Sequence, residues 1–204
     1  MATLRGANGC EWDREQTHES LVKYLIEEAH ELVDAIESGD RVEMREEIGD
    51  VLYQLLFHAD IARVDPDDPF DIDEVARVTN EKMRRRHPHV FGDVSVENVD
   101  EIKANWQKLK AEEKKDRTSV LDGVPSSLQG IARTQAVIER AARIDEHPGV
   151  SSSADVDGED QLGRELLALV KRASELGLDS DRALREATRA FEKTVRESET
   201  GQAG

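Results

Sequence analysis

The sequence is poor in cysteine and in aromatic residues. Of its 204 residues one is a cysteine, Cys10, and 4% are aromatic. A lone cysteine excludes an intrachain disulfide and is typical of a reducing compartment. The chain also lacks any apolar run of about 18 residues, the length that a transmembrane helix needs. Because its amino-terminal stretch has no apolar core of a secretory signal either, we expect a cytoplasmic protein.

Basic side chains are scarce as well. The 45 aspartate and glutamate residues outnumber the 28 lysine and arginine residues, which gives a formal net charge of −17. Such a surface repels nucleic acid and anionic membranes, so neither is an expected partner. A small polyanion remains compatible with this charge where metal ions and a local basic cluster reverse the field.

The apolar residues of the sequence are spaced as in amphipathic α-helices. Apolar residues recur at spacings of three and four, and no segment sustains the alternation typical of β-strands. The pattern predicts an all-α fold, and the short link at Gly39-Asp40 predicts that the first two long helices form an antiparallel hairpin. The expected helices cover residues 18–38, 40–64, 72–86, 97–115, 128–144, 160–177 and 180–198.

Each helix of the hairpin carries two acidic residues three positions apart. Glu28 and Glu31 lie on the first helix, and Glu47 and Asp50 lie on the second, each pair beside the apolar stripe of its helix. Antiparallel packing would bring the pairs together, and four converging carboxylates are tolerable only if cations neutralise them. Oxygen ligands favour Mg²⁺, with Mn²⁺ as a substitute, over zinc. The alternative is that both pairs are ordinary solvated helix faces.

A basic stretch, NEKMRRRHPH, stands out against the acidic background. Lys82 and Arg86 are four residues apart and share a helix face, which suits contacts with phosphate oxygens. Cations that complement a helix C-terminus are the alternative. Trp106 and Lys110 form a similar pair, in which the ring could stack on a base and the lysine could meet a phosphate. For Trp106 the alternative is core packing.

These stretches together resemble a known family. The strings GCEWDREQTHESL, LIEEAHELVDAI, REEIGDVLYQLLFHA, NEKMRRRHPHVFGD, NWQKLKAEEK and SVLDGVPSSL occur in this order in MazG, a family of bacterial nucleoside triphosphate pyrophosphohydrolases. The resemblance covers roughly residues 4–145, and several unusual strings in one order make it specific. One departure is Glu11, where the family usually has proline.

The resemblance implies a Mg²⁺-dependent homodimer of helical bundles that cleaves nucleoside triphosphates between the α- and β-phosphates. The family pattern EExxE followed by ExxD falls on Glu27, Glu28, Glu31, Glu47 and Asp50, of which the last four are the implied metal ligands. The implied phosphate contacts are Lys82, Arg86 and Lys110, and the implied base contact is Trp106. Glu27, Glu31 and Glu47 are the candidate catalytic residues, and Glu27 or Glu31 could accept the proton of the attacking water.

The carboxyl-terminal part of the sequence is similar to the α-helical region around residues 45–59, but it lacks the acidic residues of the predicted metal site. When residues 159–173 are aligned with 45–59, the apolar frame is kept, but Glu47 falls on Gln161 and Asp50 on Arg164. We therefore expect a catalytic domain over 1–145, a flexible linker over 146–159, and a degenerate half-domain with a disordered tail over 160–204. That half-domain is expected to bind no metal and to serve packing or dimer contacts.

Two other functions remain open from the sequence. Relatives with this type of helical carboxylate site act on dUTP, dCTP or phosphoribosyl-ATP, and the sequence does not reveal the base preference. A non-catalytic helical interaction module is the alternative from a different class.

Overall fold

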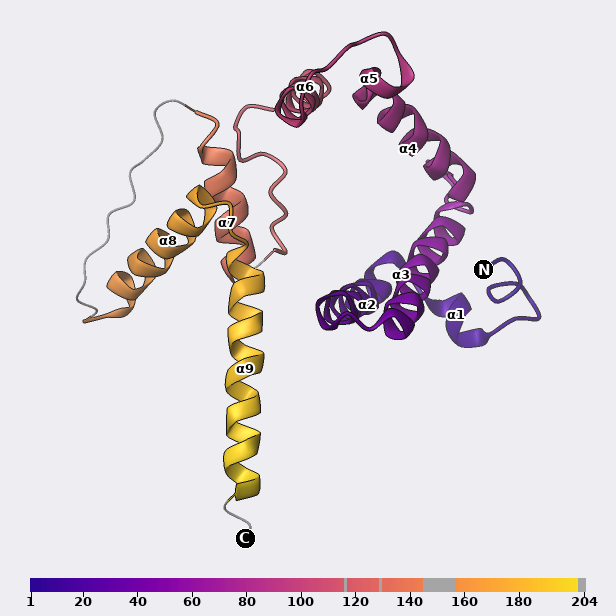
Figure 1. Cartoon of the computed structure of the whole chain (residues 1–204). Coiled ribbons are helices and arrows are strands. Elements are labelled where there is room, and N and C mark those ends of the chain that lie inside the picture. The colour runs from indigo at the N-terminus through magenta and orange to yellow at the C-terminus, as the bar shows by residue number, and fades with distance from the viewer. Residues whose placement is uncertain (116, 129, 145–156, 202–204) are drawn as a thin grey trace. The chain divides into compact units, whose positions relative to one another are not determined.

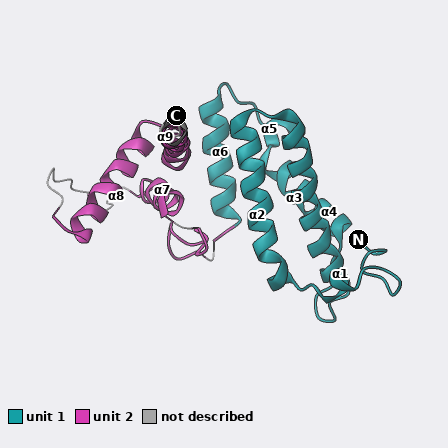
Figure 2. Ribbon diagram, turned by 90° about the horizontal axis from the view of Figure 1, so that it is seen from below, with its two compact units in different colours: residues 1–113 teal, residues 114–204 magenta. Residues whose placement is uncertain are grey.

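The computed structural model describes residues 1–115, 117–128, 130–144 and 157–201. Within these residues the secondary structure is helical and no strand occurs, which confirms the predicted all-α fold (Figure 1). The helices are α1 (Glu11–Glu15), α2 (His18–Ser38), α3 (Arg41–Ala62), α4 (Ile72–Arg86), α5 (Pro88–Phe91), α6 (Val99–Glu112), α7 (Gly130–Ala141), α8 (Glu159–Glu175) and α9 (Ser180–Gly201). They form two compact units, residues 1–113 and 114–204 (Figure 2).

The hairpin of α2 and α3 is defined by its local capping residues. Thr17 and Ser20 form a reciprocal capping box at the start of α2. Gly39 ends that helix with φ of 75°, a left-handed conformation that glycine adopts without strain. Asp40 then caps α3, since its Oδ1 accepts hydrogen bonds from the backbone of Val42 at 2.9 Å and Glu43 at 3.1 Å. The chain therefore reverses within two residues.

The core of the first unit lies between these two helices. Its buried apolar side chains are Leu21, Ala35, Phe57, Ala59 and Ala62. The amino-terminal segment closes one end of this core, because Arg5 Nε lies 3.2 Å from Asp60 Oδ2 and the guanidinium lies 5.5 Å from the centre of the Phe57 ring. This ion pair fixes residues before α1 to the last turns of α3.

The helices that follow in this unit carry the basic and aromatic side chains. Asp71 caps α4, and Pro88 prevents its continuation beyond His87, so α5 starts in a new direction. Asn98 caps α6, whose N-terminal turn contains two acidic residues that suit the helix dipole. Helix α4 packs on α3 and on α6, and it therefore connects the hairpin to α6.

The second unit is a small cluster of α7, α8 and α9, in which α7 contacts both of the others. Gln135 of α7 accepts hydrogen bonds from the backbone and hydroxyl of Ser180, at 2.9 and 2.5 Å. Arg140 donates to the carbonyls of Asp122 and Gly123, at 2.7 and 2.9 Å, and so holds the loop before α7. The packing thus groups α7 with the carboxyl-terminal helices, whereas the family resemblance runs on to about residue 145.

The predicted helices are present, with ends that agree within a few residues. The ranges 18–38 and 72–86 coincide with α2 and α4, whereas the short helices α1 and α5 were not predicted. The expected linker over 146–159 lies outside the described residues up to 156, as does the end of the expected tail at 202–204. No helix in the described part of the chain is sufficiently long and apolar to span a membrane.

The predicted apolar stripe of α3 is only partly covered. Ala59 is buried, but Ile48, Leu52 and Leu55 expose 52%, 50% and 49% of their surface. These three positions follow the spacing of a single helix face, so the exposed apolar residues are contiguous. Periodicity correctly identified the apolar face of the helix, and the single chain leaves much of that face in solvent.

Candidate metal and nucleotide site

The hairpin turn sets the register of the acidic residues. Glu28 lies eleven residues before Gly39 and Asp50 lies eleven residues after it, while Glu31 and Glu47 are each eight residues away. Because the two helices run antiparallel from this turn with the same rise per residue, positions at equal distance from it face each other. The register therefore pairs Glu28 with Asp50 and Glu31 with Glu47.

The side chains converge as this register requires. Glu28, Glu47 and Asp50 each present a carboxylate oxygen, and these three atoms lie within 4.8 Å of one another. Desolvation, followed by the charge of Asp50, raises the pKa of Glu28 above its ordinary value. Desolvation, followed by the charge of Glu31, raises the pKa of Glu47. The arrangement is therefore a strained group of like charges that a cation would stabilise.

Two buried oxygen atoms in this region have no hydrogen-bond donor among the described residues: Glu47 Oε2 and Gln54 Oε1. Gln54 is only 6% exposed and its side chain hydrogen-bonds to Glu28, so the amide extends the carboxylate group. Buried acceptors without donors are costly, and a divalent cation or its hydration water would satisfy them. The atoms that would bind the metal ion are all oxygens, which fits Mg²⁺ or Mn²⁺ and does not favour zinc.

The other two acidic residues of the motif lie at the edge of this group. Glu31 raises the pKa of both Glu28 and Glu47 through its charge, but none of its oxygens belongs to the set within 4.8 Å. Glu27 is exposed and acts on Glu28 through its charge. Gly49 approaches no other segment closely, because a Cβ placed there would meet nothing within 4 Å among the described residues.

The predicted phosphate and base contacts gather between α4 and α6. The Arg86 guanidinium carbon lies over the Trp106 ring, 5.2 Å from its centre, and the rings of Trp106 and His87 meet edge to face with their centres 5.0 Å apart. Glu113 accepts hydrogen bonds from Nε and Nη2 of Arg86, at 3.0 and 2.5 Å, and from Nε of Arg85 at 2.8 Å. Hydrogen bonding to Arg86 lowers the pKa of Glu113.

The remaining two predicted contacts belong to the same helices. Lys82 is half-buried one turn before Arg86 on α4, and Lys110 is half-buried one turn after Trp106 on α6. Within the described residues α6 packs on α4 but on neither α2 nor α3. The structure thus assembles an acidic group and a basic aromatic group, and in one chain these two groups stand on different helix pairs.

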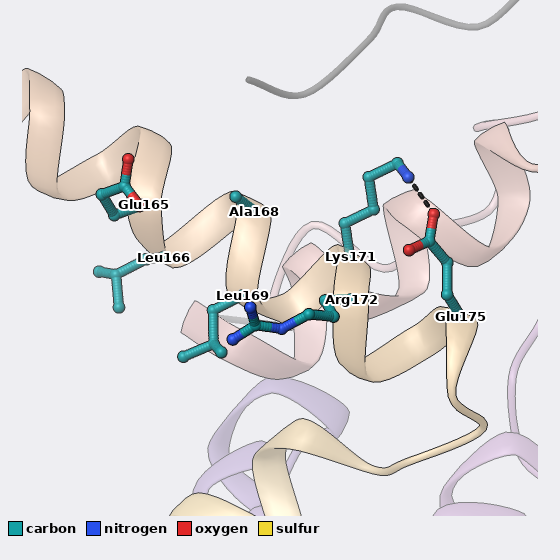
Figure 3. A pocket seen from close by; sticks show the side chains of 7 residues that line it. All are labelled: Glu165, Leu166, Ala168, Leu169, Lys171, Arg172 and Glu175. Atoms are coloured by element: carbon teal, nitrogen blue, oxygen red, sulfur yellow. Dashed lines mark hydrogen bonds and ion pairs between the residues drawn. The ribbon is translucent and has the colours of Figure 1, made fainter. Parts of the chain in front are cut away.

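A hollow on the second unit does not have the features of a reaction site. The described residues that line it all belong to α8, where Leu166 and Leu169 lie beside charged residues (Figure 3). Lys171 and Glu175, one turn apart, form an ion pair there. The other lining residues are Glu165, Ala168 and Arg172.

Sequence reasoning missed three residues of the site: Gln54, His87 and Glu113. Gln54 could have been noticed as a lone amide in the apolar run VLYQLLF, four residues after Asp50. Glu113 carries no comparable signal, since it stands in the charged run KAEEKK and its partner Arg86 lies 27 residues earlier. His87 reads as a helix end, and only the tertiary packing places it against Trp106.

The fold and the site define an all-α protein whose helical hairpin presents carboxylates suited to a divalent metal ion. Residues 16–91 match the MazG nucleotide pyrophosphohydrolase domain. An uncharacterized 26.1 kDa protein of Streptomyces cacaoi is 44% identical, over 93% of this chain and 76% of its own length. A nucleoside triphosphate pyrophosphohydrolase of Escherichia coli K12 is 36% identical, over 94% of this chain and 81% of its own length.

A third relative, the nucleoside triphosphate pyrophosphohydrolase/pyrophosphatase MazG of Thermotoga maritima, is 37% identical over 98% of this chain and 82% of its own length. The crystal structure of a MazG-related protein from the same organism shares 29% identity with a TM-score of 0.43, and the match covers 50% of this chain and 86% of that one. This chain belongs to the MazG family, and the resemblance seen in its motifs is confirmed.

Proposed function

We propose that this protein hydrolyses nucleoside triphosphates to the monophosphate and pyrophosphate in the cytoplasm, with Mg²⁺ as its cofactor. Relatives that match almost the whole chain carry the name nucleoside triphosphate pyrophosphohydrolase. The observation that carries the proposal is the convergence of Glu28, Glu47 and Asp50 within 4.8 Å, together with the buried Glu47 oxygen that finds no donor in the described part of the chain. Such a group is unfavourable by itself and becomes favourable around a divalent cation.

The residues that would hold the metal are Glu28, Glu31, Glu47 and Asp50, with Mn²⁺ as a substitute for Mg²⁺. Such an ion, when bound, supplies Lewis-acid chemistry that lowers the pKa of water and neutralises charge at a phosphate. Glu27 or Glu31 would accept a proton from the attacking water, and the support for this role is that each borders the group without lying at its centre. Gln54 holds Glu28 in place by its hydrogen bond.

The basic and aromatic group would bind the nucleotide. Lys82, Arg86 and Lys110 provide positive charge for the phosphates and for the departing pyrophosphate. Trp106 provides a ring that can stack on any base, which agrees with an enzyme of broad base preference. Because the chain carries a net charge of −17, this group is also where an anionic substrate meets a local reversal of the field.

Release of pyrophosphate from a panel of ribo- and deoxyribonucleoside triphosphates, with and without Mg²⁺, tests the activity. Glu47→Gln should abolish turnover while the protein stays folded, since it removes charge from a repulsive group. Glu46→Gln makes the same chemical change at the next residue, whose exposed side chain is not part of the metal group, and it should retain turnover. Turnover that survives Glu47→Gln would contradict the assigned site.

The same panel separates the remaining functions. Hydrolysis restricted to dUTP or dCTP would identify a related, base-specific pyrophosphatase. Absence of turnover with every nucleotide, in folded protein supplied with Mg²⁺, would favour the non-catalytic interaction module.

We further propose that the working unit is a homodimer. The exposed stripe of Ile48, Leu52 and Leu55 on the hairpin is a surface that a second copy would cover. A second copy could also bring its α6 to the acidic group, because within the described residues α6 of the same chain packs on neither α2 nor α3. Light scattering of the wild type should give the mass of two chains. Leu52→Lys should shift the protein towards the monomer and reduce its turnover. A wild type that is monomeric and active would contradict the proposed dimer.

The carboxyl-terminal region is proposed to be the degenerate second half-domain, which lacks metal ligands and serves packing or dimer contacts. In the aligned position of Asp50 it carries Arg164, which pairs with Asp160 one turn earlier. Because α7 packs on α8 and α9, the informative truncation ends at Glu113 rather than before α8. If this shortened chain is as dimeric, stable and active as the full chain, the assigned role is wrong.

A further inference from the structure

The ion pair between Glu113 and Arg86 leads to an inference about nucleotide binding, and this inference rests on the proposed function. We propose that Glu113 is a positioning residue that holds the Arg86 guanidinium against Trp106, so that the phosphate contact on α4 and the base contact on α6 are kept at a fixed separation.

The contacts of Arg86 fix the position and the plane of its guanidinium group. One oxygen of Glu113 accepts hydrogen bonds from both Nε and Nη2 of Arg86, which fixes one edge of the guanidinium group. The guanidinium carbon of Arg86 lies 5.2 Å from the centre of the Trp106 ring. The Arg86 side chain is only 10% exposed, so these contacts limit the positions that it can take. Nη1 takes no part in the hydrogen bonds to Glu113, and it is the atom of Arg86 that we assign to a phosphate oxygen.

Glu113 also connects the two helices. Its second oxygen accepts a hydrogen bond from Arg85 at 2.8 Å, so one carboxylate at the end of α6 binds two adjacent arginines at the end of α4. Arg85 is 55% exposed, whereas the Glu113 side chain is 20% exposed. The more buried arm, to Arg86, therefore determines the orientation of the cation, and the arm to Arg85 adds little, as is usual for an exposed ion pair.

The sign of the effect distinguishes positioning from simple charge. Glu113 is negative, so its removal raises the local positive charge and, by charge alone, should strengthen the binding of a triphosphate. If Glu113 instead orients Arg86, its removal frees a flexible cation and should weaken binding in spite of the gain in charge. The two roles thus predict opposite changes in nucleotide affinity.

The experiment compares Glu113→Gln with Glu112→Gln in the full-length protein. The two variants remove the same charge from adjacent residues, and in the described part of the chain the hydrogen bonds of Arg86 go to Glu113 and not to Glu112. The probes are KM and kcat for the best triphosphate of the panel, and calorimetric binding of α,β-methylene ATP, which this reaction cannot cleave. We expect Glu113→Gln to lower kcat/KM and the affinity for the analogue by roughly tenfold each, the size of a lost charged hydrogen bond. Glu112→Gln should change both by less than about twofold.

A second pair of variants tests whether the effect belongs to Arg86 or to helix packing in general. Arg85→Gln breaks only the exposed arm and should leave the affinity near that of the wild type. Glu113→Asp keeps the charge with a shorter reach and should give an intermediate affinity, and it replaces Glu113→Gln as the test should that variant not fold.

Each other result overturns the inference. Equal affinity in Glu113→Gln and Glu112→Gln would show that Glu113 has no positioning role, while the proposed activity would stand. Tighter binding in Glu113→Gln would show that Glu113 is a competing anion. If the wild type neither turns over a triphosphate nor binds the analogue, the proposed function fails and the inference fails with it.

Discussion

Replacing Glu28 by glutamine should stabilise the protein when no divalent cation is present. Its carboxylate shares a 4.8 Å group with those of Glu47 and Asp50. At that separation one pair of like charges costs about 0.9 kcal/mol in water and about 3.5 kcal/mol at an effective dielectric constant near 20. Glu28 is only partly exposed to solvent, and solvent still screens its charge, so the lower end applies and we expect a gain of about 1–2 kcal/mol in the free energy of unfolding. Glutamine still accepts the hydrogen bond from Gln54, so little is lost elsewhere.

Urea unfolding followed by circular dichroism, in EDTA and in Mg²⁺, measures this effect. In EDTA Glu28→Gln should be more stable than the wild type, while Glu112→Gln should differ little from it. Mg²⁺ should stabilise the wild type and have a much smaller effect on Glu28→Gln, because binding to the folded state alone raises its stability. If Glu28→Gln is the less stable protein in EDTA, the carboxylates do not repel each other and the reasoning about the metal site is refuted.

The same group predicts an unusual dependence of stability on pH. In the folded chain the pKa values of Glu28 and Glu47 are raised above 4.5, because desolvation and neighbouring carboxylates disfavour the charged form. The folded state therefore holds protons that the unfolded state has already lost. The stability from these groups is fully present below pH 4.5 and is lost as the pH rises through the raised pKa values. In EDTA Glu28→Gln should show a flatter profile over this range than the wild type.

Substitutions at three further positions test the fold of the first unit. Phe57→Ala, at a buried ring, should lower the free energy of unfolding by about 3–5 kcal/mol in urea, and a loss below about 1 kcal/mol would contradict its place in the core. Asp40→Ala should cost about 1 kcal/mol by removing the cap of α3, whereas Asp40→Asn should largely preserve it. Desolvation, followed by the charge of His18, lowers the pKa of His58 below 6.5, so stability from His58 is present above pH 6.5 and is lost as the pH falls through the lowered value. The rings of His18 and His58 are stacked with their centres 5.1 Å apart. His18→Gln should therefore weaken that loss in acid unfolding curves, and an unchanged profile would show that the two rings do not interact.

The hairpin and its acidic group were predictable because their determinants are local. Thr17 starts α2, Gly39 ends it, and Asp40 starts α3, so the ends of both helices are encoded in residues next to them. A short turn between antiparallel helices also fixes which positions face each other. Spacing alone therefore indicates that acidic residues at equal distance from Gly39 meet.

Features that depend on residues distant in sequence were not predictable in this way. The pair of Arg86 and Glu113 joins two helices whose relative placement depends on packing. The same holds for the exposure of Leu52, because periodicity defines an apolar face without showing whether the same chain or another covers it. The short helices α1 and α5 were not predicted, because a helix of four or five residues is too short to show a periodic pattern of apolar residues.

The acidic group depends on the spacing between the turn and the acids more than on the size of the core. One residue inserted in α3 between Asp40 and Glu47 would rotate everything after it by about 100° around the helix axis. Glu47 and Asp50 would then leave the face that meets Glu28, although the apolar character of α3 would hardly change. The same rotation would carry the buried Phe57, Ala59 and Ala62 off the face that meets α2, so the core of this unit depends on that spacing as well. The number of residues between Asp40 and Glu47 therefore determines whether the acidic group can form, and a change of composition that keeps this number would preserve the register.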